Sequence, residues 1–538
     1  MSITRRHLAL ASLGGLGLRP QLSTAQHLNS AALSPQDLRH AQALRELGLK
    51  DSLAYALTES LVTEVGARPA GSPADARAVA WAQAQMQRLG LSQVRAEPVS
   101  MKVWQRGPLN VMLSSPVPHP LTALALGNSI STAPEGLDAE VAYYPDLAAL
   151  KADHSERPKG RIVFVDQRMS RSRDGSGYGL AVMARIGGAV EAARRGAVAV
   201  VIRSIGTDRD RLAHTGAMRY DQQVAMIPAL AVSVPDAELI ARLHQRSLQP
   251  DGQPLRMRLN MRNVSHVEAT SHNVLGEIPG TDLAQEVVML SAHLDSWDVG
   301  QGAVDDGAGV GIVLAAAKTL LQGGQRPRRT VRVVLFANEE NGFDGALAYG
   351  EAHVREVHQM LSESDFGAGQ PWRLRSRVRE EALPVIQTLA ELLAPLGIAR
   401  PDTQANQGSP GPDAAFLMRK YGWPGLELTQ DGTRYFDGHH TENDTLEQVD
   451  PATLPVNVAA WATTAWVAAQ SPIEKKQFQE SRRITIQEVT EASGVSRMTL
   501  SKILNHRGYS TGTDIVDKLC TYFGCPVSDL PEHVADRG

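Results

Sequence analysis

Residues 291–311 read S-A-H-L-D-S-W-D-V-G-Q-G-A-V-D-D-G-A-G-V-G, and residues 331–340 read V-R-V-V-L-F-A-N-E-E. The apolar, valine-containing runs at 287–290 and 331–337 predict two buried strands, and the small and aliphatic residues at 307–321 predict a buried helix between them. Ligands of open α/β sheets bind beyond the carboxyl ends of the strands. This order therefore predicts an α/β fold in which the polar residues after each strand meet at one edge of the sheet.

One histidine and several carboxylates follow these strands. Imidazole and carboxylate groups without a thiolate are typical ligands of a hydrated divalent metal ion, most often zinc. Two motifs downstream, E-S-D at 363–365 and H-H-T-E-N-D-T at 439–445, would supply further ligands. An acidic doublet alone is usually a solvated loop, so the prediction of a metal site depends on the ordered set. Its members are His293, Asp295, Asp305, Asp306, Glu339, Glu340, Asp365 and His440.

These motifs resemble those of the co-catalytic zinc exopeptidases, the family that includes bacterial aminopeptidases and glutamate carboxypeptidases. The resemblance extends from about residue 53 to about residue 470, and none of the expected ligand positions is substituted. It implies two zinc ions as cofactors. One ion would be bound by His293 and Asp365, and the other by Glu340 and His440. Asp305 would bridge the two ions.

The resemblance also implies roles for the neighbouring residues. Glu339 would be the general base that takes the proton of the bridging water. Asp295 would hydrogen-bond His293 and fix the orientation of its ring. His439 would donate to the developing oxyanion, although many relatives have tyrosine at this position. The function implied is that of a zinc-dependent exopeptidase.

The family resemblance further implies a phosphorylase/hydrolase-like mixed sheet with helices on both faces. We expect the zinc peptidase domain at residues 26–110 and 266–470. Residues 111–265 contain short strands and no metal-type cluster, and they resemble the protease-associated α/β domain that this family inserts. Within them, His214-Thr215-Gly216 is interpreted either as a substrate contact or as a structural turn. A helix is expected at 346–359.

Short unblocked peptides, chiefly dipeptides, are the substrates that the resemblance implies. The sequence leaves open which end of the peptide is recognised. A pocket for the N-terminal amine would need a carboxylate, which Asp413 or Glu442 could supply. A pocket for the C-terminal carboxylate would need a cation such as Arg434. We also expect a homodimer.

The first 25 residues resemble an export signal. T-R-R-H-L at 4–8 is similar to the twin-arginine motif, a weakly apolar run follows at 8–18, and small residues precede a cleavage site after Ala25. This predicts a periplasmic or secreted protein, and the alternative is a frayed N-terminus with a chance arginine pair. The apolar run is too short to span a bilayer, and we expect no membrane span in the mature chain.

Residues 471–538 are expected to hold a linker and a small all-α module. The order of a helix at 487–493, Gly494 and a second helix at 495–504 predicts a helix-turn-helix of the Cro and phage-repressor type, in which Ser496 caps the second helix. If this module binds DNA, four side chains would face the major groove. They are Ser496, Arg497, Thr499 and Lys502.

DNA binding through residues 484–530 would make the chain a cytoplasmic fusion protein with a regulatory role, and it conflicts with export. Residues 471–538 contain nine basic and nine acidic residues, and the whole chain has a formal net charge of −4, so neither shows the basic surplus of a polyanion-binding protein. A misjoined reading frame and a reused interaction module are the alternatives. For the central stretch, glycine spacing argues against a dinucleotide site, and the absence of G-x-S-x-G argues against a serine hydrolase.

Overall fold

The computed structural model describes residues 33–473, 490, 493–505, 514–515 and 518. The chain divides into two compact units, one with Leu22–Glu480 and the other with Met1–Gln21 and Ser481–Gly538, and each is described by itself. The predicted export signal and most of the first helix of the predicted helix-turn-helix lie outside the described residues. None of the described helices has both the length and the apolar character that a membrane crossing requires.

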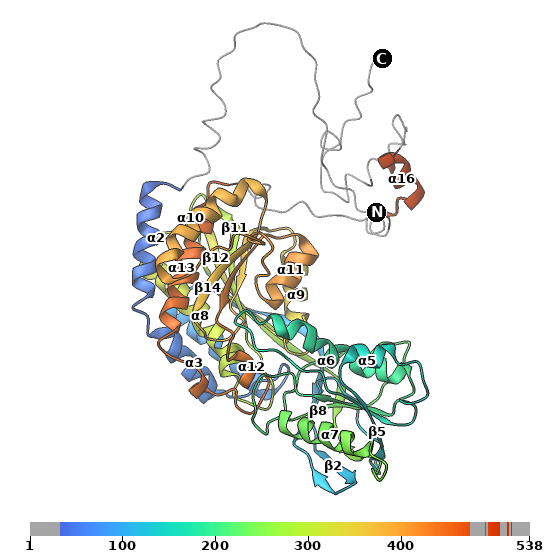
Figure 1. The fold of residues 1–538 in the computed structure, drawn as a ribbon. Coiled ribbons are helices and arrows are strands. Elements are labelled where there is room, and N and C mark those ends of the chain that lie inside the picture. Colours follow the sequence, from blue (N-terminus) through green and yellow to red (C-terminus); the bar gives the residue numbers. More distant parts are fainter. Residues whose placement is uncertain (1–32, 474–489, 491–492, 506–513, 516–517, 519–538) are drawn as a thin grey trace. The chain divides into compact units, whose positions relative to one another are not determined.

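Seven strands of the described chain form the main sheet, in the order β1-β10-β12-β11-β13-β15-β14 (Figure 1). The central strands β12, β11, β13 and β15 run parallel, and β1, β10 and β14 run antiparallel to their neighbours. This confirms the predicted mixed sheet. The strands are β1 (Ser92–Gln105), β10 (Val264–Ile278), β11 (Leu283–His293), β12 (Arg329–Phe336), β13 (Val357–Glu363), β14 (Pro371–Arg377) and β15 (Gly425–Gln430).

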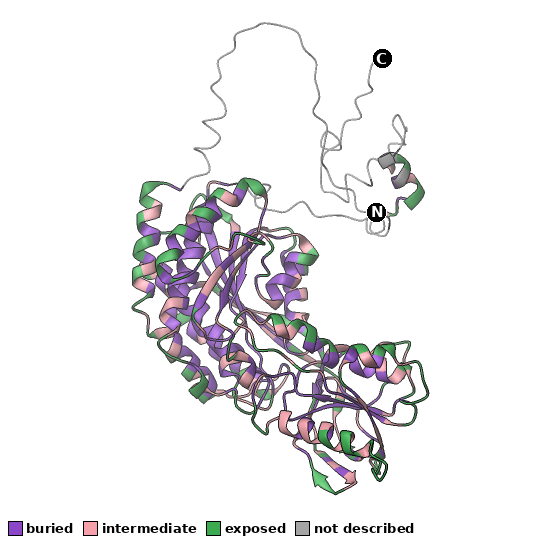
Figure 2. Ribbon diagram, in the orientation of Figure 1, coloured by how far each residue is buried: buried purple, intermediate pink, exposed green. Residues whose placement is uncertain are grey.

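Helices cover both faces of the main sheet because its central strands are apolar on both sides. In β12, Val333 and Leu335 enter one hydrophobic cluster, whereas Val334 and Phe336 enter the cluster on the opposite face. Strand β12 is buried along its whole length, and Figure 2 shows mostly buried strands between the helices. One face packs against α2 (Pro35–Gly48), α3 (Leu53–Glu64), α4 (Pro73–Leu89), α8 (Ala308–Gln322), α10 (Leu383–Leu393) and α13 (Leu454–Gln470), and the other against α9 (Asp344–His353) and α11 (Pro412–Tyr421).

Between β1 and β10 the chain leaves the main sheet and builds a second one, in the order β3-β2-β9-β5-β6-β7-β8-β4. We call residues 109–261 the insert. Its core strands β6 and β7 are buried along their whole length. The strands are β2 (Leu109–Ser115), β3 (His119–Pro120), β4 (Ala123–Ala125), β5 (Leu137–Tyr144), β6 (Ile162–Val165), β7 (Ala199–Arg203), β8 (Ala229–Val232) and β9 (Arg256–Met261), and the helices are α5 (Leu147–Ala152), α6 (Ser176–Arg194) and α7 (Val234–Ser247).

The predicted helix at 346–359 is wrong in its second half. Helix α9 ends at His353, and β13 begins at Val357. Residues 357–363 pair with β11 in the middle of the parallel sheet, and this pairing outweighs the local helical preference. The difference matters because β13 carries Asp365 to the carboxyl edge of the sheet.

Packing around the main sheet extends to Ile473. Arg329 Nη2 donates to the Ile473 carbonyl at 3.2 Å, and Gln359 Nε2 donates to the same oxygen at 2.7 Å. Ser471 and Ile473 are buried. A truncation that removes only the C-terminal segment therefore begins after Ile473, beyond the expected boundary at residue 470.

The described part of the C-terminal unit contains α16 (Arg497–Asn505). The Ser496 hydroxyl accepts from the Thr499 N–H at 3.1 Å, as expected of a capping residue. Gly494 has a φ of +69°, which suits the turn before this helix. The side chains of Ser496, Arg497 and Lys502 are exposed and Thr499 is half-buried. Their contact with DNA stays a prediction.

His358 of β13 is a buried neutral histidine. Its ring stacks on Trp423 at 3.7 Å, and the Tyr349 hydroxyl lies 2.8 Å from Nε2. Burial, and after it the Arg332 guanidinium, lowers the pKa of His358 to about 3. In the unfolded chain, the His358 ring takes up a proton near pH 6.5, whereas in the folded protein it stays neutral. The contribution of His358 to the free energy of unfolding is therefore complete above about pH 6.5 and falls as the pH decreases towards 3.

We therefore expect His358→Phe to reduce the acid sensitivity of the fold. Between pH 6.5 and 4.5, the free energy of unfolding of the wild-type protein should fall more steeply than that of the variant, by about 1.4 kcal/mol per pH unit. Denaturant titrations at several pH values, with a metal chelator present throughout so that bound metal does not change with pH, measure this slope. His154→Phe, at an exposed position, is the control and should keep the wild-type slope. Equal slopes for wild type and His358→Phe would contradict the assignment.

Candidate active site

The five predicted metal ligands meet at the carboxyl edge of the parallel strands. Among the described residues, these side chains form groups of three whose ligand atoms all lie within 4.8 Å of one another. One of these groups includes the neighbouring Asp306, and another includes His439. The parallel strands explain this, because their carboxyl ends lie side by side. The five residues are His293 at the end of β11, Asp305 before α8, Glu340 after β12, Asp365 after β13 and His440 after the short helix α12 (Tyr435–Gly438).

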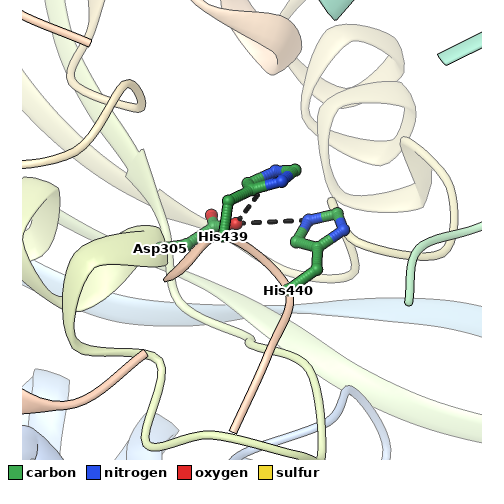
Figure 3. A group of neighbouring side chains, drawn as sticks. All are labelled: Asp305, His439 and His440. Carbon is green, nitrogen blue, oxygen red and sulfur yellow. Dashed lines mark ion pairs between the residues drawn. The ribbon is translucent and has the colours of Figure 1, made fainter. Parts of the chain in front are cut away.

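The Asp305 carboxylate lies between two histidines. Its Oδ1 is 3.0 Å from His293 Nε2, and its Oδ2 is 3.2 Å from His440 Nε2. Glu340 Oε2 lies 3.1 Å from His440 Nε2, and Asp365 Oδ1 lies 3.7 Å from His293 Nε2. Figure 3 shows the rings of the 439–440 segment beside this carboxylate. Each oxygen of Asp305 therefore faces a different histidine and a different second carboxylate.

Both histidine rings have an acceptor for a proton on Nδ1. His293 Nδ1 lies 3.0 Å from the Asp295 carbonyl, and His440 Nδ1 lies 3.2 Å from the Thr215 carbonyl. In this tautomer of the neutral ring, Nε2 has a lone pair for a metal ion. Asp305 Oδ2 and one oxygen of Glu340 are buried without a hydrogen-bond partner among the described residues. Converging lone pairs of this kind need a cation between them, so the residues fit a metal ion.

Glu339 and Glu340 point in different directions from one turn. Glu340 is buried, whereas Glu339 is half-buried and lines the cleft in front of the ligands. Burial raises the pKa of the Glu339 carboxyl well above its ordinary value, and the nearby Asp365 and Glu340 add to this. The preceding Asn338 has a φ of +60°, a conformation in which asparagine is enriched. The doublet therefore offers one carboxylate to the metal and one to a proton.

A cleft of roughly 530 Å³ opens in front of the ligand set. The insert forms one wall of it, with Tyr178, Arg185 and Arg219 among the lining residues. Neither Asp413, Arg434 nor Glu442 lines this cleft. Asp413 is fully buried in the first turn of α11, and Arg434 and Glu442 are exposed to solvent away from it. The three substrate assignments made from the sequence are therefore not retained.

Comparison with known proteins places this site in a family. Residues 273–465 match the model of peptidase family M28. Carboxypeptidase Q of Bos taurus and that of Homo sapiens are each 35% identical over 424 residues, which cover 78% of this chain and 86% of theirs. The chain belongs to peptidase family M28. It is a metallopeptidase, and the resemblance seen in the motifs is confirmed.

A solved M28 structure supports this assignment. The peptidase M28 precursor from Shewanella amazonensis SB2B is 44% identical, covers 83% of this chain and 99% of its own, and aligns with a TM-score of 0.78. An aminopeptidase from Aneurinibacillus sp. strain AM-1, at 18% identity and a TM-score of 0.54, shares the fold. Residues 476–536 match the model of the Cro/C1-type HTH DNA-binding domain.

Two residues that the sequence did not assign to the M28 site hold its glycine-rich loop. Asp444 accepts the N–H groups of Ala303 and Val304 at 2.9 and 2.6 Å. Arg68 has no exposed surface and donates to the carbonyls at 294, 301 and 302 at distances of 2.6–2.9 Å. Asp444 belongs to the motif at 439–445 and Arg68 lies in the loop at 66–72, but their partners lie more than 100 residues away in the chain.

Asp295 supports the M28 site in a different way from the one expected. Its carbonyl, rather than its carboxylate, is the acceptor for His293, because Asp295 Oδ1 lies 3.7 Å from the His293 Nδ1. The carboxylate accepts the N–H groups of Glu339 and Glu340 at 3.1 and 3.4 Å. Asp295 therefore contacts both the ring of one candidate ligand and the turn that carries Glu339 and Glu340.

His439 lies over the ligand set. Its ring stacks on His440 at 3.6 Å, and its Nε2 is 3.5 Å from Asp305 Oδ2. Burial, and after it His440, lowers the pKa of His439 well below its ordinary value, so the ring stays neutral. His214 does not line the cleft; it is buried against the 439–440 segment, which favours the structural interpretation of the two left open.

Proposed function

We propose that this metallopeptidase hydrolyses short unblocked peptides, chiefly dipeptides, and that it does so with two zinc ions. The observation that supports two ions, and not one, is that the two oxygens of the Asp305 carboxylate each face a different histidine. His293 and Asp365 would hold one ion and Glu340 and His440 the other, and Asp305 would bridge them. Zinc is supported by a solved relative of the same fold from Bacillus subtilis that is described as a zinc aminopeptidase.

In the proposed reaction, bound zinc supplies a water of lowered pKa and polarises the scissile carbonyl. The Glu339 carboxylate takes the proton of the attacking water and returns it to the nitrogen of the leaving amine. Its raised pKa suits a group that must hold this proton between the two steps. The neutral His439 ring donates an N–H to the carbonyl oxygen as negative charge develops on it. The insert wall of the cleft keeps solvent from this face.

Arginine side chains that line the cleft could bind the free C-terminal carboxylate of a substrate peptide. Arg375 already donates to Glu427 at 2.9 Å. Arg219 and Arg419 line the cleft, are exposed and make no ion pair within the described part of the chain. We therefore assign the recognition of the substrate carboxylate to these two side chains, in place of Arg434.

Parallel assays of free, N-acetylated and C-amidated forms of one dipeptide test the substrate class. The free form should be hydrolysed best. Arg219→Ala or Arg419→Ala should lower kcat/KM for the free form by about 10- to 100-fold, because a hydrogen bond to a charged group contributes about 1.5–3 kcal/mol. The same substitution should leave kcat/KM for the amidated form nearly unchanged, which is the control. Activity confined to long or N-blocked chains would contradict the proposal.

We assign the function to the peptidase core and not to the C-terminal segment. That segment matches a DNA-binding domain model, but residues 471–538 carry nine basic and nine acidic residues. Phosphate contacts supply most of the affinity of non-specific DNA binding, and a neutral module has little of it. Regulation through DNA remains the second candidate.

A further inference from the structure

Three residues of the insert contact the 439–440 segment from behind the metal ligands. His214 Nδ1 lies 2.7 Å from the His439 carbonyl, and the Thr215 N–H donates to the His440 carbonyl at 3.0 Å. Arg185 Nη1 donates to the Thr215 carbonyl at 3.3 Å and lies 3.3 Å from His440 Nδ1, which itself lies 3.2 Å from the Thr215 carbonyl. We call His214, Thr215 and Arg185 the insert clamp.

The insert clamp is closely fitted. His214 and Arg185 are 1% and 7% exposed, and His214 Nε2 lies 2.6 Å from Asp208 Oδ2. A Cβ at Gly206 would lie 2.3 Å from the His214 ring, and a Cβ at Gly216 would lie 2.2 Å from the Arg185 guanidinium. Only glycine leaves room for these two side chains where they pass the loops.

The segment held by the clamp needs such support. His440 has a φ of +60°, which is uncommon for a residue with a Cβ and persists where the surroundings impose it. The Thr215 N–H and carbonyl bind the His440 main chain and ring at the same time. Together they determine which way Nε2 points.

The two histidine ligands differ in where their support comes from. The Nδ1 of His293 is held by Asp295, two residues away in the peptidase core. The Nδ1 of His440 is held by Thr215 of the insert. One half of the ligand set is therefore complete within the peptidase core, and the other half is not.

We propose that the insert clamp is a positioning device for the His440 half of the metal site: it orients the ring so that Nε2 faces Glu340 and Asp305. The insert then controls the affinity of one zinc ion and leaves the ion at His293 unaffected. This inference rests on the proposed two-zinc centre. Removal of partners that orient a metal ligand typically lowers metal affinity 10- to 100-fold. Loss of the clamp should therefore lower the affinity for one zinc ion by this factor.

The test is zinc binding by the full chain, measured by competition with a chelator and by elemental analysis of the equilibrated protein. Arg185→Met removes the donors that hold Thr215. Gly216→Ala keeps every clamp residue but displaces the Arg185 guanidinium. Arg195→Met is the matched control, because Arg195 follows the same helix α6 and donates within the insert, to Glu191 and the Asp153 carbonyl.

Wild type and Arg195→Met should each bind two zinc ions, with the same affinities in the chelator competition. Arg185→Met and Gly216→Ala should bind one ion as wild type does and the other 10- to 100-fold more weakly. Wild-type affinity for both ions in these variants would overturn the inference while leaving the two-zinc centre intact. A wild-type protein that binds fewer than two ions would overturn the two-zinc centre and the inference with it. If Arg185→Met does not fold, Arg185→Lys serves instead. It keeps a cationic donor and should lower the affinity for one zinc ion by a smaller factor.

Discussion

Glu339→Gln is expected to keep its zinc and to lose turnover by a factor of about 10²–10⁴, the range that general acid–base catalysis contributes. Glutamine has nearly the shape of glutamate but cannot take a proton from water at neutral pH. The zinc content should not change, because Glu340 and not Glu339 lies beside His440. Steady-state kinetics on a free dipeptide and elemental analysis of the same preparation measure both quantities.

Glu442→Gln is the control for this experiment. It makes the same chemical change at an exposed carboxylate that does not line the cleft, and it should retain wild-type kcat. Retention of wild-type turnover by Glu339→Gln would remove Glu339 from the role of base. Loss of zinc from Glu339→Gln would instead place this residue among the ligands.

Asp305→Asn is expected to release both zinc ions and to reduce activity by about 10³-fold or more. The amide is neutral, and its NH₂ group would point a donor at one of the two histidine lone pairs that the carboxylate now faces. A loss of about 4 kcal/mol in metal binding corresponds to roughly this factor. Zinc content and kcat/KM should fall together.

The melting temperature of zinc-free protein separates this effect from unfolding. Without zinc, the Asp305 carboxylate pairs with His293 and His440, and despite burial these rings lower its pKa well below the ordinary value, so Asp305→Asn should melt below wild type in the same chelator but still unfold in one cooperative transition. A variant that keeps two zinc ions per chain would show that Asp305 does not bridge them. A variant that keeps one would assign Asp305 to a single ion.

The peptidase fold and the meeting of the candidate ligands at one sheet edge were predictable because the sequence signals for them are local. The valine-rich runs before His293 and Glu339 predicted parallel strands, and a general rule about carboxyl ends then brought the polar residues together. The structure has β11 end at His293 and β12 end three residues before Glu339. The helix expected at 346–359 failed for the opposite reason, because β13 depends on its neighbours β11 and β15 and not on its own propensity.

The side chains assigned to substrate from their residue type do not line the cleft. Asp413, Arg434 and Glu442 have suitable charges and lie near ligand motifs in the chain, but one is buried and two face solvent away from the cleft. Arg219 and Arg419 line the cleft although no motif marks them. Which side chain faces a cleft depends on the packing of distant elements, and a charge pattern does not encode it.

The sequence by itself predicted the class of fold and the metallopeptidase chemistry of this protein: it offered histidine and carboxylate side chains as candidate ligands and Glu339 as a candidate base, each at a strand end or in a loop whose motif is contiguous. Only the tertiary structure decided how these ligands are held. Thr215 and His440 are separated by more than 200 residues, yet the Thr215 carbonyl of the insert lies 3.2 Å from the Nδ1 of that ring. The physical reason is that strand ends follow from local hydrophobic patterns, whereas the partner of a histidine's second nitrogen depends on how the insert packs against the main-sheet domain.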